Sequence, residues 1–200
     1  MKKGLLITLG VFGILILIVV STIGWGVGKY NGFVTLDQAA TSQWAQVENV
    51  YQRRADLVPN LVSTVKGVAK FEKETFTAVT EARAKVGQVK IDPTNITAEG
   101  LKKFQEAQAG LGGALQRLMV VSENYPQLKA NENFLQLQAQ LEGTENRIAV
   151  ERKKYNEAAQ EFNTAIKKFP GSIIAGMGGF SEKAYFKADE GAKSAPKVEF

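Results

Sequence analysis

The chain begins with an apolar stretch that predicts a membrane-spanning helix. Between Gly4 and Gly28 there are 25 residues without a charged side chain, and residues 14–20 are seven consecutive aliphatic residues. At about 1.5 Å per residue this helix would span roughly 37 Å, enough to cross a hydrocarbon core of about 30 Å. A cleaved secretory signal is the alternative, but the apolar run exceeds the usual ~7–15 residues and no A-x-A site follows. Residues 1–30 are therefore predicted to be a transmembrane anchor.

After the anchor, apolar side chains recur at alternating intervals of four and three residues, which is typical of helices in a bundle or coiled coil. We call the set of positions at this spacing a seam, since they lie along one face of a helix. The first seam is Phe33, Asp37, Ala40, Trp44, Val47, Tyr51, Arg54, Val58, Leu61, Val65, Val68, Glu72, Thr75, Val79, Ala82 and Val86. Its register passes Pro59 without a change of phase. Because a loop usually resets the phase, the pattern predicts one helix of roughly 53 residues with a kink at Pro59. Two helices joined by a loop are the alternative.

Two further seams predict two more helices. Residues 87–97 hold the Gly, Asp, Pro and Asn residues typical of a turn. The second seam is Leu101, Phe104, Gln108, Leu111, Leu115, Leu118, Ser122 and Tyr125, and the third is Phe134, Leu137, Leu141, Thr144, Ile148, Glu151, Tyr155, Ala158, Phe162, Ala165 and Phe169. The glycines at 110, 112 and 113 indicate either close packing or a local break of the second helix. The third helix is expected to have about 38 residues and to close at Phe169-Pro170-Gly171.

No run of useful length shows the two-residue period of a strand, so the predicted fold is all-α. Residues 31–169 are expected to form an antiparallel bundle of long helices. Residues 170–186 are apolar and rich in glycine, too short to span a membrane and too flexible for a good helix. We expect them to be an extended tail docked along the bundle; a strip that contacts a partner or the membrane surface is the alternative. Residues 187–200 are small, polar and charged, and are predicted to be disordered.

Composition narrows the possible functions. The chain has no cysteine and no histidine, which excludes disulfides, thiolate chemistry and the commonest general base and metal ligand. No cofactor or metal site is expected. The net charge of +5 includes three lysines in the first thirty residues, so the remainder carries 22 basic and 20 acidic side chains, a net of +2. Because these charges alternate in sign, nucleic acid is not an expected partner.

A possible interhelical polar cluster is the strongest candidate site. Arg54, Asp56 and Asn60 surround Pro59 on the first helix, and Glu145 and Arg147 lie on the last. An enzyme could use such carboxylates as acid and base. Interhelical ion pairs that set the register of a long bundle are the expectation we favour. No catalytic residue is assigned.

A second candidate feature lies in the anchor, where Gly24 and Gly28 are four residues apart. Small residues at this spacing let two membrane helices approach closely. For the pair alone we favour the interpretation that glycines are simply common in membrane helices. Together with seams longer than a small domain needs, the pair still leads us to expect a homo-oligomer.

Several multi-residue segments between roughly residues 30 and 187 form a distinctive set. They include Arg53-Arg54-Ala55-Asp56-Leu57-Val58-Pro59-Asn60-Leu61-Val62, Ala82-Arg83-Ala84, Glu123-Asn124-Tyr125-Pro126, Gly143-Thr144-Glu145-Asn146-Arg147-Ile148, Tyr155-Asn156 and Tyr185-Phe186. These segments resemble the LemA family of bacterial membrane proteins. The resemblance implies a single-pass membrane protein with a helical bundle and no settled biochemical activity. Members are often encoded near membrane metalloproteases, which hints at envelope quality control. The resemblance supplies no catalytic residues.

Orientation follows from the charges that flank the anchor. Lys2, Lys3 and the free amine precede it and Lys29 alone follows it closely, which favours a cytoplasmic N-terminus and an extracytoplasmic bundle. Trp25 and Tyr30 lie where an aromatic belt is expected at the exit side. The expected location is the bacterial inner membrane, with lipid as the first partner.

Two functions remain for this architecture. The first is a non-enzymatic envelope scaffold that self-associates. The alternative is a binding or adaptor module for another membrane protein, such as a quality-control protease. An enzyme is not expected, because the residue types that would carry its chemistry are missing.

Overall fold

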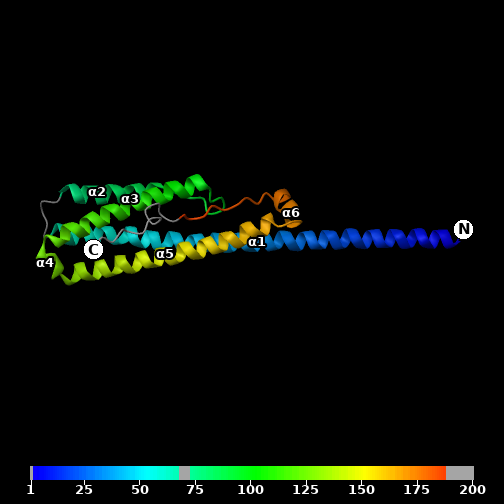
Figure 1. The fold of residues 1–200 in the computed structure, drawn as a ribbon, viewed down its shortest axis with the longest axis horizontal. Helices are drawn as coiled ribbons and strands as arrows, with labels where there is room; N and C mark the ends of the chain where they lie inside the picture. Colours follow the sequence, from blue (N-terminus) through cyan, green and yellow to red (C-terminus); the bar gives the residue numbers. More distant parts are fainter. Residues whose placement is uncertain (1, 68–72, 188–200) are drawn as a thin grey trace, which may run out of the picture.

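The computed structural model describes residues 2–67 and 73–187 and shows an all-α protein. The helices are α1 (Lys2–Lys66), α2 (Lys73–Gln88), α3 (Ala98–Glu123), α4 (Pro126–Lys129), α5 (Glu132–Lys167) and α6 (Gly171–Met177). Figure 1 shows α1, α2, α3 and α5 alternating in direction as an antiparallel bundle, with the N-terminal part of α1 projecting beyond it. The predicted fold class is confirmed.

Helix α1 joins the apolar segment to the bundle without interruption over 65 residues. It is long and apolar enough to cross a membrane, and its apolar window is fully exposed. From Phe33 onward the same helix buries one face in the bundle. The segment predicted to be the anchor is therefore continuous in direction with the domain that it carries.

The first helix ends earlier than its periodicity predicts. It passes through Pro59, as the unbroken register suggested, but ends at Lys66, and α2 begins at Lys73. The prediction of one helix to Val86 is wrong, because the chain reverses before α2 and Val79 packs back into the cluster that contains Val65. The predicted helix therefore comprises two antiparallel helices.

Helices α3 and α5 begin and end close to the residues that the sequence predicts. Helix α3 begins at the N-cap Thr97, whose hydroxyl accepts from the Gly100 amide at 3.1 Å. It continues through its three central glycines, so the alternative of a local break there is wrong. Asn131 caps α5 by accepting from the Phe134 amide at 3.1 Å. Helix α5 has 36 residues and leaves Phe169 outside it, 81% exposed.

Among the described residues, the core consists of three clusters along the rod. The distal cluster includes Leu61, Val65, Val79, Leu111, Leu118, Leu128 and Phe134. The central cluster includes Trp44, Val47, Tyr51, Ile96, Phe104, Ile148, Tyr155 and Phe186. The cluster nearest the anchor includes Phe33, Phe162, Ile166 and Ala175. All three draw on α1 and on helices or segments distant from it in sequence, so one long helix organises the whole core.

The C-terminal segment is partly helical. Residues 171–177 form α6 against the part of α1 that leaves the bundle, so the expectation that this glycine-rich stretch is too flexible for a helix is wrong. Docking against Phe33 explains its order, because Gly171 leaves only 3.1 Å between an added Cβ and the Phe33 ring. Residues 182–187, here called the strap, lie extended on the bundle, as expected for a docked tail. Residues 187–200 are predicted to be disordered. From residue 188 on, they lie outside the described part of the chain.

Candidate functional site

A groove of about 520 Å³ lies where α3 and α5 face each other over α1. Its apolar lining comprises Ala109, Leu115, Met119, Leu141 and Ile148. Its polar lining comprises Tyr51, Arg54, Gln105, Gln108, Gln116, Gln138, Glu142, Glu145 and Arg152. Side-chain amides both donate and accept hydrogen bonds, so four glutamines around an apolar floor suit a polar chain with apolar substituents, such as an extended peptide.

Arg54 crosses one wall of this groove and is only 4% exposed. Its Nη1 donates to Glu145 Oε1 at 2.7 Å, and its Nη2 donates to the Gln108 backbone oxygen at 3.0 Å and to Gln108 Oε1. The guanidinium also lies over the Tyr51 ring, 5.1 Å from its centroid. Arg54 Nε is buried and has no hydrogen-bond partner among the described residues. A buried cation thus ties together α1, α3 and α5.

The structure brings together two of the five residues of the predicted polar cluster. Arg54 and Glu145 form the ion pair. Asp56, Asn60 and Arg147 are exposed, and the Asp56 carboxylate accepts from Gln52 on its own helix at 2.8 Å. Asp56 and Asn60 are exposed because they lie two and six residues after Arg54, on the outer face of α1.

The groove also contains a buried phenol, that of Tyr51. Burial raises the pKa of Tyr51, against the opposing effect of the Arg152 and Arg54 charges. Tyr51 therefore remains a neutral phenol at physiological pH. Within the described residues, no group of three or more Asp, Glu, His or Cys side chains is placed to hold a metal ion.

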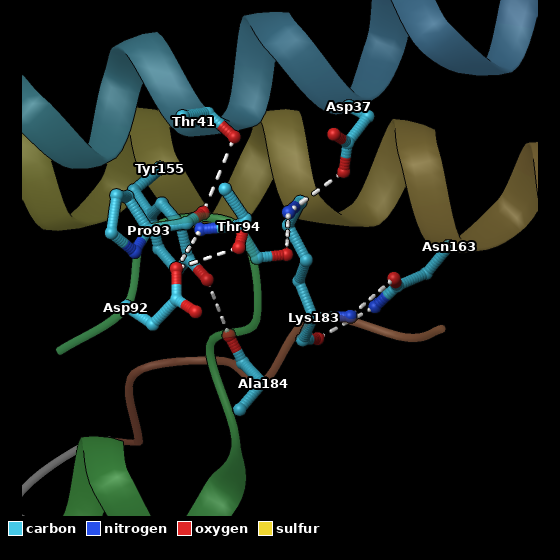
Figure 2. Close-up of polar contacts among 9 residues, drawn as sticks. All are labelled: Asp37, Thr41, Asp92, Pro93, Thr94, Tyr155, Asn163, Lys183 and Ala184. Atoms are coloured by element: carbon cyan, nitrogen blue, oxygen red, sulfur yellow. Dashed lines mark hydrogen bonds and ion pairs between the residues drawn. The ribbon is translucent and has the colours of Figure 1, made fainter. Parts of the chain in front are cut away.

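A second polar site joins the strap to the bundle, as Figure 2 shows. The Lys183 side chain is 2% exposed, and its Nζ lies 2.8 Å from Asp37 Oδ1 on α1. The same Nζ donates to the Thr94 backbone oxygen at 3.4 Å. Asp92 holds that turn by accepting from the Thr94 amide and hydroxyl, which lower the Asp92 pKa. One lysine therefore connects the strap, α1 and the loop before α3.

Two asparagines on α5 bind the backbone of the strap. Asn163 donates to the Lys183 carbonyl at 2.8 Å and accepts from its amide at 2.9 Å. Asn156, seven residues earlier and so on the same helix face, makes the corresponding pair with Phe186 at 3.0 and 2.9 Å. Tyr155 donates to the Ala184 carbonyl at 3.0 Å. The strap is thus held as an extended peptide, mainly through its main chain.

The strap leads to the mouth of the groove. Phe186 stacks on Trp44, with ring centroids 5.8 Å apart, in the central cluster. The Lys187 carbonyl then accepts from Arg152 at 2.9 Å and from Gln105 at 3.4 Å. Both donors also line the groove. The strap site and the groove are therefore neighbours that share two side chains.

Sequence reasoning did not assign a role to Gln108, Lys183 or the two α5 asparagines. A signal existed for Gln108, because it is a polar residue on a mostly apolar seam, as Arg54 is. Asn156 and Asn163 are also seven residues apart beside aromatic seam positions. Lys183 carried no such signal, because it lies outside any periodic segment.

Comparison with known proteins places this geometry in a family. The model of the LemA family matches residues 43–200, which hold nearly all of the bundle, the groove and the strap. The chain belongs to the LemA family. The match begins within α1, after the segment predicted to cross the membrane.

Relatives of this LemA-family chain include magnetosome proteins. Magnetosome protein MamQ 2 of Paramagnetospirillum magneticum (strain ATCC 700264 / AMB-1) is 31% identical over 86% of the chain and 70% of its own length. Magnetosome protein MamQ of Magnetospirillum gryphiswaldense is 30% identical over 79% of the chain and 64% of its own length. Protein LemA of Metamycoplasma hominis is 24% identical over 82% of the chain and 71% of its own length. The family and the apolar helix together indicate a membrane-associated helical protein.

Proposed function

We propose that this protein is a non-enzymatic membrane scaffold that self-associates through its anchor. The observation that carries the proposal is the continuity of α1, which runs from the apolar segment into the core of the bundle without a break. A continuous helix transmits the orientation set in the membrane to the domain outside it. Association of two anchors would therefore also align two bundles.

The exposed face of the anchor supports this proposal. A Cβ added at Gly24 or Gly28 would meet nothing within 4 Å, so the face is open to another helix. Ser21 lies about one turn before Gly24 and extends the strip of small residues. Close approach of backbones at such a strip is how membrane helices associate without a hydrophobic driving force.

Disulfide crosslinking in the native membrane tests self-association, because the chain contains no cysteine. Ser21→Cys places a thiol on the small-residue face, and Thr22→Cys places one on a face rotated by about 100°. We expect dimer from S21C under mild oxidation, little from T22C, and loss of the S21C dimer on adding Gly24→Leu and Gly28→Leu. Equal yields from both thiols, or none from either, would contradict the proposal.

A second candidate function is that of a binding or adaptor module, and the groove favours it. Its apolar lining and its four glutamines suit an extended segment of another protein. A membrane protein such as a quality-control protease would be within reach of a rod anchored beside it.

Photocrosslinking from inside the groove tests the binding function. A photoreactive residue at Gln116 faces the groove, and one at the exposed Val150 of α5 is a matched control. Binding predicts a discrete adduct from position 116 that is absent from position 150 and weakened by Arg54→Met. Identical adduct patterns from the two positions would count against a specific groove partner.

We further propose a single pass through the bacterial inner membrane with a cytoplasmic N-terminus. The charges that flank the apolar segment support this orientation.

A further inference from the structure

Three large apolar side chains are exposed at the end of the bundle nearest the anchor. Phe169 is 81% exposed, Ile173 57% and Met177 85%. Ile173 and Met177 are four residues apart in α6 and so share one face of that helix. An exposed cluster of large apolar residues on a water-soluble surface usually marks a contact site.

The position of α6 along α1 identifies what lies next to this cluster. Ile174 Cδ1 is 3.7 Å from a Cβ added at Gly26, and Gly178 packs against the Tyr30 ring. Helix α6 therefore lies beside residues 26–33 of α1, where the apolar segment ends (Figure 1). If residues 4–28 cross the hydrocarbon core, α6 lies at the level of the lipid headgroups.

Charge and aromatic side chains at this level fit a lipid surface. Lys29 and Lys168 line a hollow of about 590 Å³ that also includes Phe169 and one carboxylate, Glu161. Tyr30 packs on Phe180 with ring centroids 5.4 Å apart, next to α6. Aromatic rings and lysines gather at membrane interfaces, where the rings sit among headgroups and the ammonium groups meet phosphates.

We propose that Phe169, Ile173 and Met177 form a second membrane contact, inserted among the headgroups and upper acyl chains of an anionic leaflet. Lys29 and Lys168 would face lipid phosphates beside it. The inference rests on the proposed membrane crossing of α1, since that crossing sets the height of α6. With two contacts, the anchor and α6, the rod is held at a fixed tilt to the membrane instead of pivoting about one helix.

The absence of cysteine allows a direct measurement of depth in the full-length protein. Met177→Cys and Val120→Cys each introduce one thiol at an exposed apolar position, near the anchor and toward the distal end of α3 respectively. Each variant is labelled with an environment-sensitive fluorophore and reconstituted in vesicles of phosphatidylcholine with or without phosphatidylglycerol. Nitroxide-bearing lipids then report whether the fluorophore reaches the headgroup region.

We expect quenching at position 177 to exceed that at position 120 by about threefold, with a blue-shifted emission only at 177. Replacing Lys29 and Lys168 by Gln should reduce the quenching in phosphatidylglycerol vesicles and leave it unchanged in pure phosphatidylcholine. Equal, weak quenching at the two positions would overturn the proposal. A signal at 177 that depends on the protein-to-lipid ratio would instead identify a second copy as the occupant, and would overturn it too.

The depth measurement can fail while the scaffold proposal holds, and the scaffold proposal can fail while the depth measurement succeeds. Fluorophore depth at residue 177 is measured at low protein density and does not require association. The S21C crosslink requires association and is insensitive to where α6 lies. A failure of both, together with loss of vesicle co-sedimentation, would instead overturn the membrane crossing itself.

Discussion

Arg83 donates a hydrogen bond from Nε to the carbonyl oxygen of Ala55 at 2.9 Å, across the contact between α2 and α1. In an uninterrupted helix this carbonyl would accept from the amide four residues later, which is position 59. Pro59 has no N–H to donate. Because Ala55 is buried, an unpaired carbonyl there would be costly. Arg83 thus supplies the missing donor and lets α1 continue through the proline.

The Arg83 bond predicts a coupling with Pro59. Arg83→Ala should lower the free energy of unfolding by about 1–3 kcal/mol, because it leaves a buried acceptor unsatisfied. In a Pro59→Ala background the same change should cost less, since the backbone amide restored at position 59 can donate to the Ala55 carbonyl. Chemical denaturation in detergent, followed by circular dichroism, measures both effects. Arg117→Ala, at an exposed site of α3, serves as the control, and strictly additive effects of R83A and P59A would contradict the explanation.

The Arg54–Glu145 pair predicts a second coupling. The Arg54 side chain is buried while that of Glu145 is half exposed, so Glu145→Ala leaves a buried guanidinium short of its counter-charge. A double-mutant cycle with Arg54→Met should give a coupling energy of about 0.5–3 kcal/mol. The exposed Lys153–Glu157 pair should give less than about 0.5 kcal/mol in the same cycle. Equal coupling in the two pairs would indicate that burial of Arg54 plays no part.

Loss of the Asp37 carboxylate should release the strap. Asp37→Asn leaves the ammonium group of Lys183 buried without its counter-ion, at a cost of about 3 kcal/mol. Hydrogen exchange of the strap amides should accelerate, while that of the distal cluster should not. Adding Lys183→Met should restore slow exchange, because it removes the buried charge. Glu182→Gln, which breaks only an exposed pair with Lys167, should leave exchange unchanged.

The buried face of the first helix could be predicted residue by residue. Every seam position from Phe33 to Val65 is buried except Asp37, which is partly buried. The polar positions on the seams were also informative, since the side chains of Arg54 and Gln108 from different seams are bonded to each other. A buried polar residue on an apolar seam needs a partner, and for Arg54 one partner lies on another seam.

The end of the first helix could not be predicted from periodicity. Val65 and Val79 are fourteen residues apart, which is two heptads, so two antiparallel helices preserve the same phase as one. The strap was also beyond this reasoning. Its backbone carries most of its contacts with Asn156 and Asn163, and backbone contacts leave no pattern in the side chains of the strap itself.

Alkaline pH should destabilise the bundle through two buried tyrosines. Burial raises the pKa of Tyr155, with a smaller contribution from Tyr185, and burial also raises the pKa of Tyr51. An unfolded tyrosine ionises near pH 10, so above this value the unfolded state loses protons that the folded state retains, and stability falls as pH rises. The melting temperature should be insensitive to these groups below about pH 10 and should fall above it. Tyr155→Phe should make the fall in melting temperature above about pH 10 smaller. It should also lower the melting temperature below about pH 10, because it removes the hydrogen bond to Ala184. A melting temperature unchanged up to about pH 11 would contradict this.

The charges that flank the apolar segment predict the orientation of the protein in the membrane. Lys2, Lys3 and the amine lie on one side of the apolar segment and Lys29 on the other. Lys168 lines the same hollow as Lys29, but it is about 140 residues from the apolar segment in sequence, outside the window of about 15–20 residues in which charges decide orientation. The expected result is a cytoplasmic N-terminus and an extracytoplasmic bundle.

Single cysteines in the otherwise cysteine-free chain make this orientation measurable. Val150→Cys exposes a thiol on the bundle, and Gly4→Cys places one at the opposite end of the apolar segment. A membrane-impermeant maleimide is applied to cells whose outer layer is permeabilised and whose inner membrane is intact. It should label V150C at once and G4C only after lysis. Labelling of V150C that also requires lysis would reverse the orientation. The groove and the strap would then face the cytoplasm, and any partner would have to be sought among proteins on that side of the membrane.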